Sequence, residues 1–256
     1  MKQAEEKDRS LDQEGREERE ELSEATWSHV APFAFWIAWI LLWERVVVDE
    51  SSVMNAWMYA IQSIVGLSLF LYYEPWRWYG RLNIRNIPLA TAVGVGVFVV
   101  WILPETGFVR DQLPRFHELY LRYGLIPPWD THEATDPSPY SPVICGWALA
   151  ILRLMGSAFV IAFIEEFFWR GFLYRWMQGA NFLKVDIGRM DWPMFLLICL
   201  VFASVHVQWL VAIAAGAAYL WLMIHTRDIW AACIAHVVTN FILGIYVLAT
   251  GSFGFW

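Results

Sequence analysis

The chain has 256 residues, 58% of them hydrophobic, and its mean hydropathy is +0.42. A soluble domain is about half apolar, and here the excess lies in long uninterrupted runs. The formal net charge is −7, but residues 1–26 contain ten acids and five bases, so most of the acidity belongs to this tail. No basic patch is interleaved with aromatic residues, so nothing supports nucleic-acid binding. The three scattered cysteines indicate neither a disulfide framework nor a structural zinc site.

The N-terminal segment differs from the rest of the chain because it is charged throughout. A secretory signal peptide needs a basic start followed by a short apolar core and a small-residue cleavage site, whereas residues 1–26 are charged throughout. We therefore interpret residues 1–29 as an acidic, partly helical tail outside the membrane.

Seven later runs are apolar and long enough to cross a bilayer core of about 30 Å as helices. Helices are expected because backbone groups in lipid must find hydrogen-bond partners within their own segment. The fold is therefore predicted to be an all-α, polytopic transmembrane helical bundle with about seven spans, and with six to eight as the range. We expect the fourth run to bend away after Arg170, at Gly171, and the fifth and sixth runs to form a tight hairpin. The runs are residues 30–48, 53–73, 87–103, 143–176, 192–207, 209–225 and 229–250.

The distribution of lysine and arginine predicts the orientation. If the N-terminus is cytoplasmic, twelve basic residues fall in the inside segments and only Arg110, Arg115 and Arg122 fall outside, which satisfies the positive-inside rule. The predicted domains are the cytoplasmic tail 1–29, a three-helix membrane part 30–103, an extracytoplasmic polar loop 104–142 and a helical core 143–256.

The fourth run contains two adjacent acids and an arginine, Glu165, Glu166 and Arg170. Charges within a span are costly and are retained when they pair or act. Glu166 and Arg170 are four residues apart, so they share a helix face and can neutralise each other. Glu165 is left as the unpaired acid, and burial would let it exchange a proton near neutral pH, as a general base must.

Two further spans carry polar side chains of catalytic type. His206 lies in the fifth run, whereas His236 and Asn240 lie four residues apart on one face of the seventh. An imidazole and a carboxamide can donate hydrogen bonds to an oxyanion. Arg153 is about 120° from Glu165 around the helix, and we expect it to pair within the bundle or to reach the membrane surface.

The motifs E-E-x-x-x-R-G, F-x-x-x-H and H-x-x-x-N, on successive apolar helices, resemble those of the type II CAAX prenyl endopeptidases in the CPBP group of intramembrane proteases. The resemblance covers roughly residues 143–248. It implies a metal-independent glutamate protease without a cofactor, in which Glu165, assisted by His206, activates water. It also implies that His236 and Asn240 stabilise the oxyanion and that Glu166 and Arg170 support the site.

The predicted function is therefore hydrolysis of a peptide bond in a membrane-anchored peptide or protein substrate. The expected partners are this substrate and membrane lipid, and the expected location is the plasma or inner membrane if the source is prokaryotic. Two alternatives remain. One is a non-catalytic immunity or scaffold protein of the same family. The other is a zinc protease in which Glu165, His206 and His236 bind the metal, since zinc accepts two histidines and a carboxylate.

Overall fold

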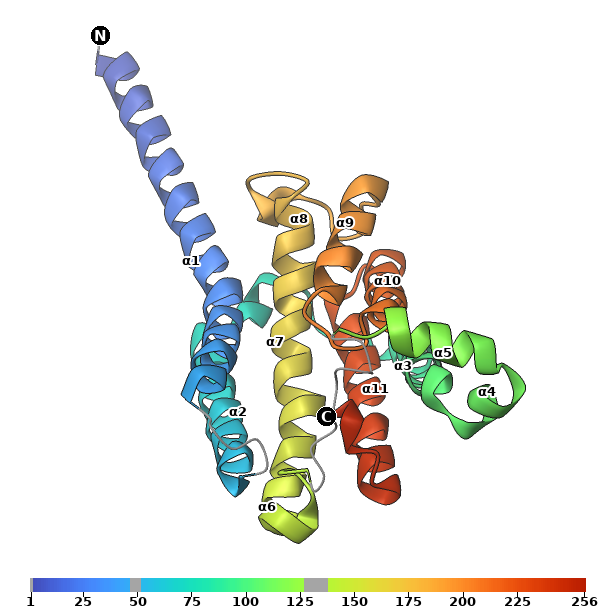
Figure 1. Cartoon of the computed structure of the whole chain (residues 1–256). Coiled ribbons are helices and arrows are strands. Elements are labelled where there is room, and N and C mark those ends of the chain that lie inside the picture. Colours follow the sequence, from blue (N-terminus) through green and yellow to red (C-terminus); the bar gives the residue numbers. More distant parts are fainter. Residues whose placement is uncertain (1, 47–51, 127–137) are drawn as a thin grey trace.

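The computed structural model describes residues 2–46, 52–126 and 138–256, without the side chains of residues 2–12, 44 and 46 (Figure 1). The predicted end of the first run at residues 47–48 and the middle of the polar loop lie outside this range. The α-helices are α1 (Lys2–Val46), α2 (Val53–Tyr73), α3 (Ile87–Ile102), α4 (Gly107–Gln112), α5 (Pro114–Tyr123), α6 (Pro142–Met155), α7 (Ala162–Glu166), α8 (Tyr174–Trp176), α9 (Trp192–Ala203), α10 (Trp209–Thr226) and α11 (Ile229–Thr250).

Two π-helical segments, η5 (Gly156–Ile161) and η6 (Phe167–Leu173), join α6, α7 and α8 into one helical rod, which has a kink at Gly146 near its start. The 3-10 helices are η1 (Pro75–Trp78), η2 (Ile84–Asn86), η3 (Leu103–Glu105), η7 (Phe182–Lys184) and η8 (Phe253–Phe255). The described part of the chain contains no strand. The predicted all-α class is confirmed.

Six helical stretches in the described residues are long and apolar enough to cross a membrane. The fifth predicted run, residues 192–207, corresponds to α9, which has only 12 residues and would rise about 18 Å. Because a full crossing needs about 20 residues, α9 alone does not span. The transmembrane bundle is thus confirmed, with a count at the lower end of the predicted range.

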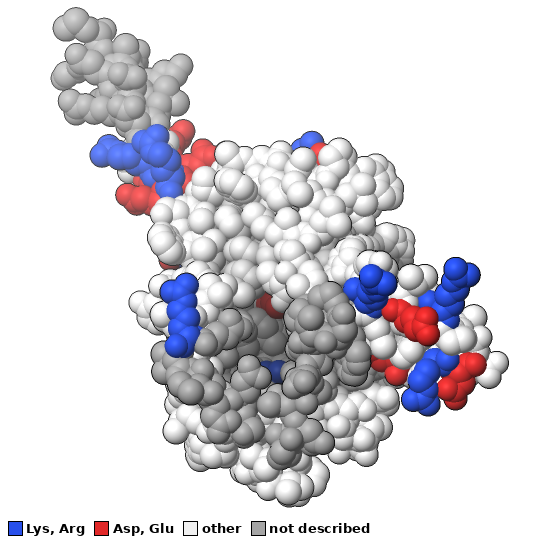
Figure 2. All heavy atoms as spheres, in the orientation of Figure 1, with Lys and Arg blue, Asp and Glu red and all other residues white. Residues whose placement is uncertain are grey.

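The outer surface of the bundle is apolar, as a lipid-facing surface must be. Leu42 is 64% exposed, Ile64 58% and Leu196 60%. Soluble monomers rarely expose large contiguous apolar patches. Figure 2 shows charged side chains gathered on the projecting part of α1 and on the arm formed by α4 and α5, with mostly uncharged surface between them.

The first helix is continuous from the tail into the membrane, so the tail and the first span share one axis. Its start projects from the body (Figure 1). Further along, Glu24 pairs with Arg77, and Glu18 pairs with Lys184 at 2.6 Å. These contacts attach the helix to the connections that follow α2 and α8.

The centre of the bundle is formed by α11, which packs against α3, α10 and the α6–α8 rod. Asp228 begins α11 by accepting a hydrogen bond from the Trp230 amide, and a carboxylate is a favourable N-cap. Ala231, Ala232 and Cys233 are fully buried in the first turns of the helix. This packing holds the polar face of α11 against the acids of the rod.

Candidate active site

The two adjacent acids lie in α7, between the two π-helical segments of the rod. A π turn is rare in proteins as a whole. Where one occurs, it is often near a functional site, because it shifts the side-chain register within a helix. The predicted bend at Gly171 is wrong: helical backbone continues to Trp176, and Arg175 is buried. Gly171 is needed for close packing, since a Cβ there would meet the hydroxyl of Tyr79.

Glu166 and Arg170 form the pair that their spacing predicts. Their charged atoms lie 3.0 Å apart, and the side chains are 0% and 1% exposed. Arg170 Nη1 has no directed hydrogen bond, so this contact is an ion pair by distance. The guanidinium also donates to the Gly216 carbonyl at 3.3 Å and lies over the Phe202 ring. Glu166 is therefore neutralised and held in place.

His236 lies between the two carboxylates. Its Nδ1 is 2.8 Å from Glu166 Oε1, and its Nε2 is 3.9 Å from Glu165 Oε2. Because an ionised carboxylate only accepts, the short contact makes Nδ1 the donor. The ring is also stacked on Tyr219, with the centroids 4.8 Å apart. The orientation of His236 is thus set by one hydrogen bond and one stacking contact.

Glu165 differs from its neighbour in having no hydrogen-bond partner among the described residues. Its side chain is 12% exposed, and the separation of 3.9 Å from His236 is too long for a hydrogen bond. A water molecule next to both groups could bridge a gap of this kind. Glu165 is the acid of the pair that remains available for proton transfer.

Asn240 lies one turn after His236 on α11, and its amide donates to the Ser157 carbonyl at 2.8 Å. Ser157 is in the first π segment of the rod. One amide hydrogen is therefore used to join α11 to the rod. The carboxamide has a second hydrogen, and this one makes no hydrogen bond to a described residue.

His206 lies after the end of α9, in the turn that leads to α10. Its Nδ1 donates to the Phe202 carbonyl at 2.8 Å, which leaves Nε2 as the acceptor in the neutral ring. Three hydrogen bonds hold this turn against the end of α5: the Ile126 amide to Val207, the Leu210 amide to Gly124, and the Trp209 indole to Tyr123. The polar loop thus positions His206.

The sequence indicates a difference in depth of about 10 Å among Glu165, His206 and His236 if all lie on straight spans. His206 does not lie on a straight membrane-spanning helix, because α9 ends before it. The estimate of the depth difference therefore does not apply to this residue. The Phe202 ring lies 4.4 Å from the His206 ring and 6.4 Å from the His236 ring. His236 in turn lies 3.9 Å from Glu165. The three groups therefore belong to one cluster.

No motif in the sequence points to the residues that hold this cluster together. The Tyr219 hydroxyl donates to Thr239 at 2.8 Å, and the Thr239 hydroxyl contacts the Gly94 carbonyl at 2.8 Å. Tyr219 lies in a run without charges, so only its stacking on His236 reveals a role. Thr239 follows His236 by three residues and so shares its helix face. This spacing is the signal in the sequence that could have identified Thr239.

The zinc alternative requires three donors around one point. No group of three or more His, Cys, Asp or Glu side chains within residues 2–46, 52–126 and 138–256 is arranged to hold a metal ion. In this arrangement Glu165, His206 and His236 do not form such a ligand set.

Comparison with known proteins identifies the segment that contains this cluster. Residues 147–242 match the family model described as Type II CAAX prenyl endopeptidase Rce1-like. The match confirms the resemblance predicted from the three motifs, and together with the membrane-spanning helices it supports a membrane protease-like family. Neither the search of curated proteins nor that of solved structures gave a match.

Proposed function

We propose, on the premise that residues 147–242 form a type II CAAX prenyl endopeptidase Rce1-like domain, that the protein is an intramembrane endopeptidase. Its reaction is the hydrolysis of a peptide bond in a membrane-associated substrate. The observation that carries this proposal is the position of His236, which contacts the ion-paired Glu166 and lies next to the unpaired Glu165.

In the proposed reaction, Glu165 is the general base. It takes a proton from water while the water oxygen bonds to the scissile carbonyl carbon, and the carbonyl oxygen becomes an oxyanion. Glu165 then returns the proton to the nitrogen, and the C–N bond breaks to release an amine and a carboxylic acid. General bases of this kind contribute about 10²–10⁴-fold to rate.

The neighbouring side chains have separate proposed roles. His206 orients the attacking water through Nε2, which is a hydrogen-bond acceptor because Nδ1 donates to the Phe202 carbonyl. Asn240 donates its second amide hydrogen to the oxyanion, and His236 donates from Nε2 when both ring nitrogens carry protons. Glu166 and Arg170 do not react; Glu166 holds the orientation of the His236 ring through its contact with Nδ1, and Arg170 holds Glu166.

Glu165→Gln tests this assignment. The variant keeps the shape of the side chain but cannot accept the proton, so we expect peptide release to fall by about 10²–10⁴-fold. The measurement is mass spectrometry of peptides released from membranes that contain equal amounts of wild type or variant. Glu118→Gln, which removes an exposed acid on α5, is the matched control and should cleave like wild type.

The same experiment addresses the remaining candidates. The polar contacts His236–Glu166 and Tyr219–Thr239 join helices, and they would also serve a non-catalytic scaffold protein. Equal peptide profiles for Glu165→Gln and wild type would contradict the protease proposal and support the scaffold function. Phenanthroline should not inhibit the wild type, whereas inhibition reversed by zinc would favour the metal mechanism.

A further inference from the structure

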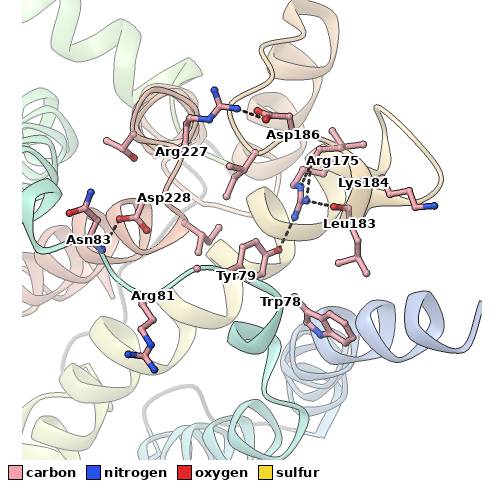
Figure 3. Close-up of a pocket in the computed structure, with 15 residues that line it drawn as sticks. Trp78, Tyr79, Arg81, Asn83, Arg175, Leu183, Lys184, Asp186, Arg227 and Asp228 are labelled. Atoms are coloured by element: carbon pink, nitrogen blue, oxygen red, sulfur yellow. Dashed lines mark hydrogen bonds and ion pairs between the residues drawn. The ribbon is translucent and has the colours of Figure 1, made fainter. Parts of the chain in front are cut away.

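A second polar region lies away from the cluster of Glu165 and His236, where three connections of the bundle meet. Together they enclose a pocket of about 440 Å³ (Figure 3). Its walls come from residues 78–83 after η1, residues 183–187 before α9 and residues 226–229 between α10 and α11, with Arg175 of α8. Hydrogen bonds from the Asn83 amide and the Asn86 side chain to Asp228 join two of these connections. We call this region the connection pocket.

The connection pocket contains a buried cation without a counter-ion. Arg175 is 6% exposed, and its guanidinium donates to the carbonyls of Val185, Leu183 and Gly171. No carboxylate forms an ion pair with it in the part of the chain that the structure describes. Carbonyls satisfy its hydrogens but do not neutralise its charge, and a buried charge is normally paired.

The neighbouring hydroxyl does not supply the missing negative charge. Tyr79 lies 3.5 Å from Arg175 Nη1, and burial raises the pKa of its phenol above the usual value. Tyr79 is therefore neutral at physiological pH. The rings of Tyr79 and Phe182 each lie 5.7 Å from the Arg175 guanidinium, near the outer limit for a cation–π contact. Arg175 can therefore still attract an anion from outside.

The other ionic side chains of the pocket leave a positive excess. Four cations and two carboxylates line it, a formal excess of two positive charges. Asp228 is occupied by hydrogen bonds from Asn83, Asn86 and the Trp230 amide, and Asp186 is paired with Arg227. Figure 3 shows Arg81 and Lys184 extending outward from the edge of the pocket. Lys184 is paired with Glu18 there, and exposed pairs of this kind contribute little free energy.

We propose that the connection pocket binds one phosphate-bearing anion, either the headgroup of an anionic phospholipid or a soluble phosphate. Arg175 would supply the buried charge, and the exposed side chains of Arg227 and Arg81 would turn inward from the edge to contact the phosphate. Basic pockets between membrane helices bind such headgroups, and the aromatic residues Trp78 and Trp230 at this level are typical of the lipid–water interface. The site does not include the proposed catalytic residues, so it does not depend on the proposed protease function.

The test uses the purified full chain in a neutral detergent, titrated with dioleoyl phosphatidylglycerol or dioleoyl phosphatidylcholine and followed by native mass spectrometry. Wild type should retain one phosphatidylglycerol molecule in preference to phosphatidylcholine. The double variant Arg81→Gln with Arg227→Gln removes two cations at the edge. Each cation near a membrane surface contributes about fivefold to the affinity for an anionic lipid. The affinity of the double variant should therefore fall about 10- to 30-fold.

The matched control is Arg85→Gln with Arg189→Gln, because both residues are exposed and neither lines the pocket. It removes the same charge from the neighbouring connections and should bind like wild type. Arg175→Gln is expected to abolish binding if it elutes as a single species. Because Arg175 also holds the connection before α9, the variant pair at the edge remains the deciding test if Arg175→Gln does not fold.

Inorganic phosphate identifies the source of the anion. Displacement of the lipid by millimolar phosphate would support a soluble phosphate as the ligand, and retention of the lipid would support the headgroup. Equal retention of the two lipids by wild type, without phosphate binding, would overturn the proposal. An equal loss in both double variants would also overturn it, because general surface charge would then explain the binding.

Discussion

At the scale of single residues, the two adjacent glutamates have different environments although they share one helix. Glu166 is fully buried, ion-paired with Arg170 and hydrogen-bonded to His236, whereas Glu165 is 12% exposed and has no hydrogen-bond partner among the described residues. The difference follows from their separation of about 100° around the helix. The proposal that Glu166 supports the site and that Glu165 is the general base rests on this difference.

This difference predicts effects on stability of very different size. Glu166→Gln leaves Arg170 buried without a counter-ion and should destabilise the fold by about 3–5 kcal/mol. The charged contact that Glu165→Gln removes is the long one to His236, at 3.9 Å. This variant should therefore change stability by less than about 1 kcal/mol. Thermal unfolding in detergent, followed by tryptophan fluorescence, measures both.

A further double variant separates lost charge balance from lost packing. Glu166→Gln combined with Arg170→Met removes both charges, and replacement of a whole buried pair is often close to neutral. We therefore expect the double variant to be more stable than Glu166→Gln alone. An unfolding temperature at or below that of the single variant would contradict the ion-pair explanation.

Arg153 shows how a cation in a span can be held without an acid. Its guanidinium lies 3.9 Å from the centroid of the Tyr59 ring and 4.5 Å from that of Tyr140. The expected pairing within the bundle is thus with aromatic faces, which attract cations most strongly when water is excluded. The sequence could not reveal this arrangement, because Tyr59 and Tyr140 are distant in the chain.

At the scale of secondary-structure elements, the close packing of α3 on α11 fixes the position of His236. A Cβ at Gly94 would meet the Ala235 carbonyl and the side chain of Val238, and the Gly94 carbonyl accepts the Thr239 hydroxyl. Small residues allow this close approach between membrane helices. Gly94 therefore sets the distance between α3 and α11, the helix that carries His236 and Asn240.

Two glycines on α3 provide a matched test of this contact. Gly94→Ala places a methyl group against α11 and should cost about 1–3 kcal/mol, as overpacking does, with reduced peptide release. Gly96→Ala adds a methyl group where nothing lies within 4 Å, so stability should be unchanged or slightly higher. Unfolding temperature and peptide release are measured for both, and equal effects would show that the contact at Gly94 does not position α11.

The short α9 explains how His206 reaches the cluster. Because α9 ends at Ala203 and the following turn is bonded to residues 123–126, the histidine is placed by the polar loop as well as by its own helix. Apolar character extends through Val207 in the sequence, so the prediction of a longer span was reasonable. The turn after α9 forms hydrogen bonds with residues 123–126, and the sequence does not reveal contacts between such distant segments.

At the scale of the whole molecule, the basic residues gather where the connections of the bundle meet. The projecting tail is paired with Arg77 and Lys184 in these connections, and the connection pocket lies among them. The turn that follows α9 is instead bonded to the end of α5. The positive-inside rule predicts that the basic connections and the N-terminus face the cytoplasm.

Cysteine labelling in intact bacterial cells tests this orientation. In a Cys145→Ser background, in which the remaining native cysteines Cys199 and Cys233 are buried, Glu118→Cys on α5 should react with a membrane-impermeant maleimide from outside. Arg85→Cys in η2 should react only after the cells are broken. The reverse pattern would contradict the predicted orientation and place the tail outside.

Sequence alone determined the helical class, the apolar spans and the motifs of the family match, because hydrophobic run length and i,i+4 spacing are local properties. The bounds of α2 and α11 agree with the predicted runs at 53–73 and 229–250. Tertiary structure alone decided that Glu166, and not Glu165, takes the hydrogen bond from His236. It also decided where α9 ends and which aromatic faces hold Arg153. These features depend on contacts between segments far apart in the chain, and such contacts leave no periodic signal in the sequence.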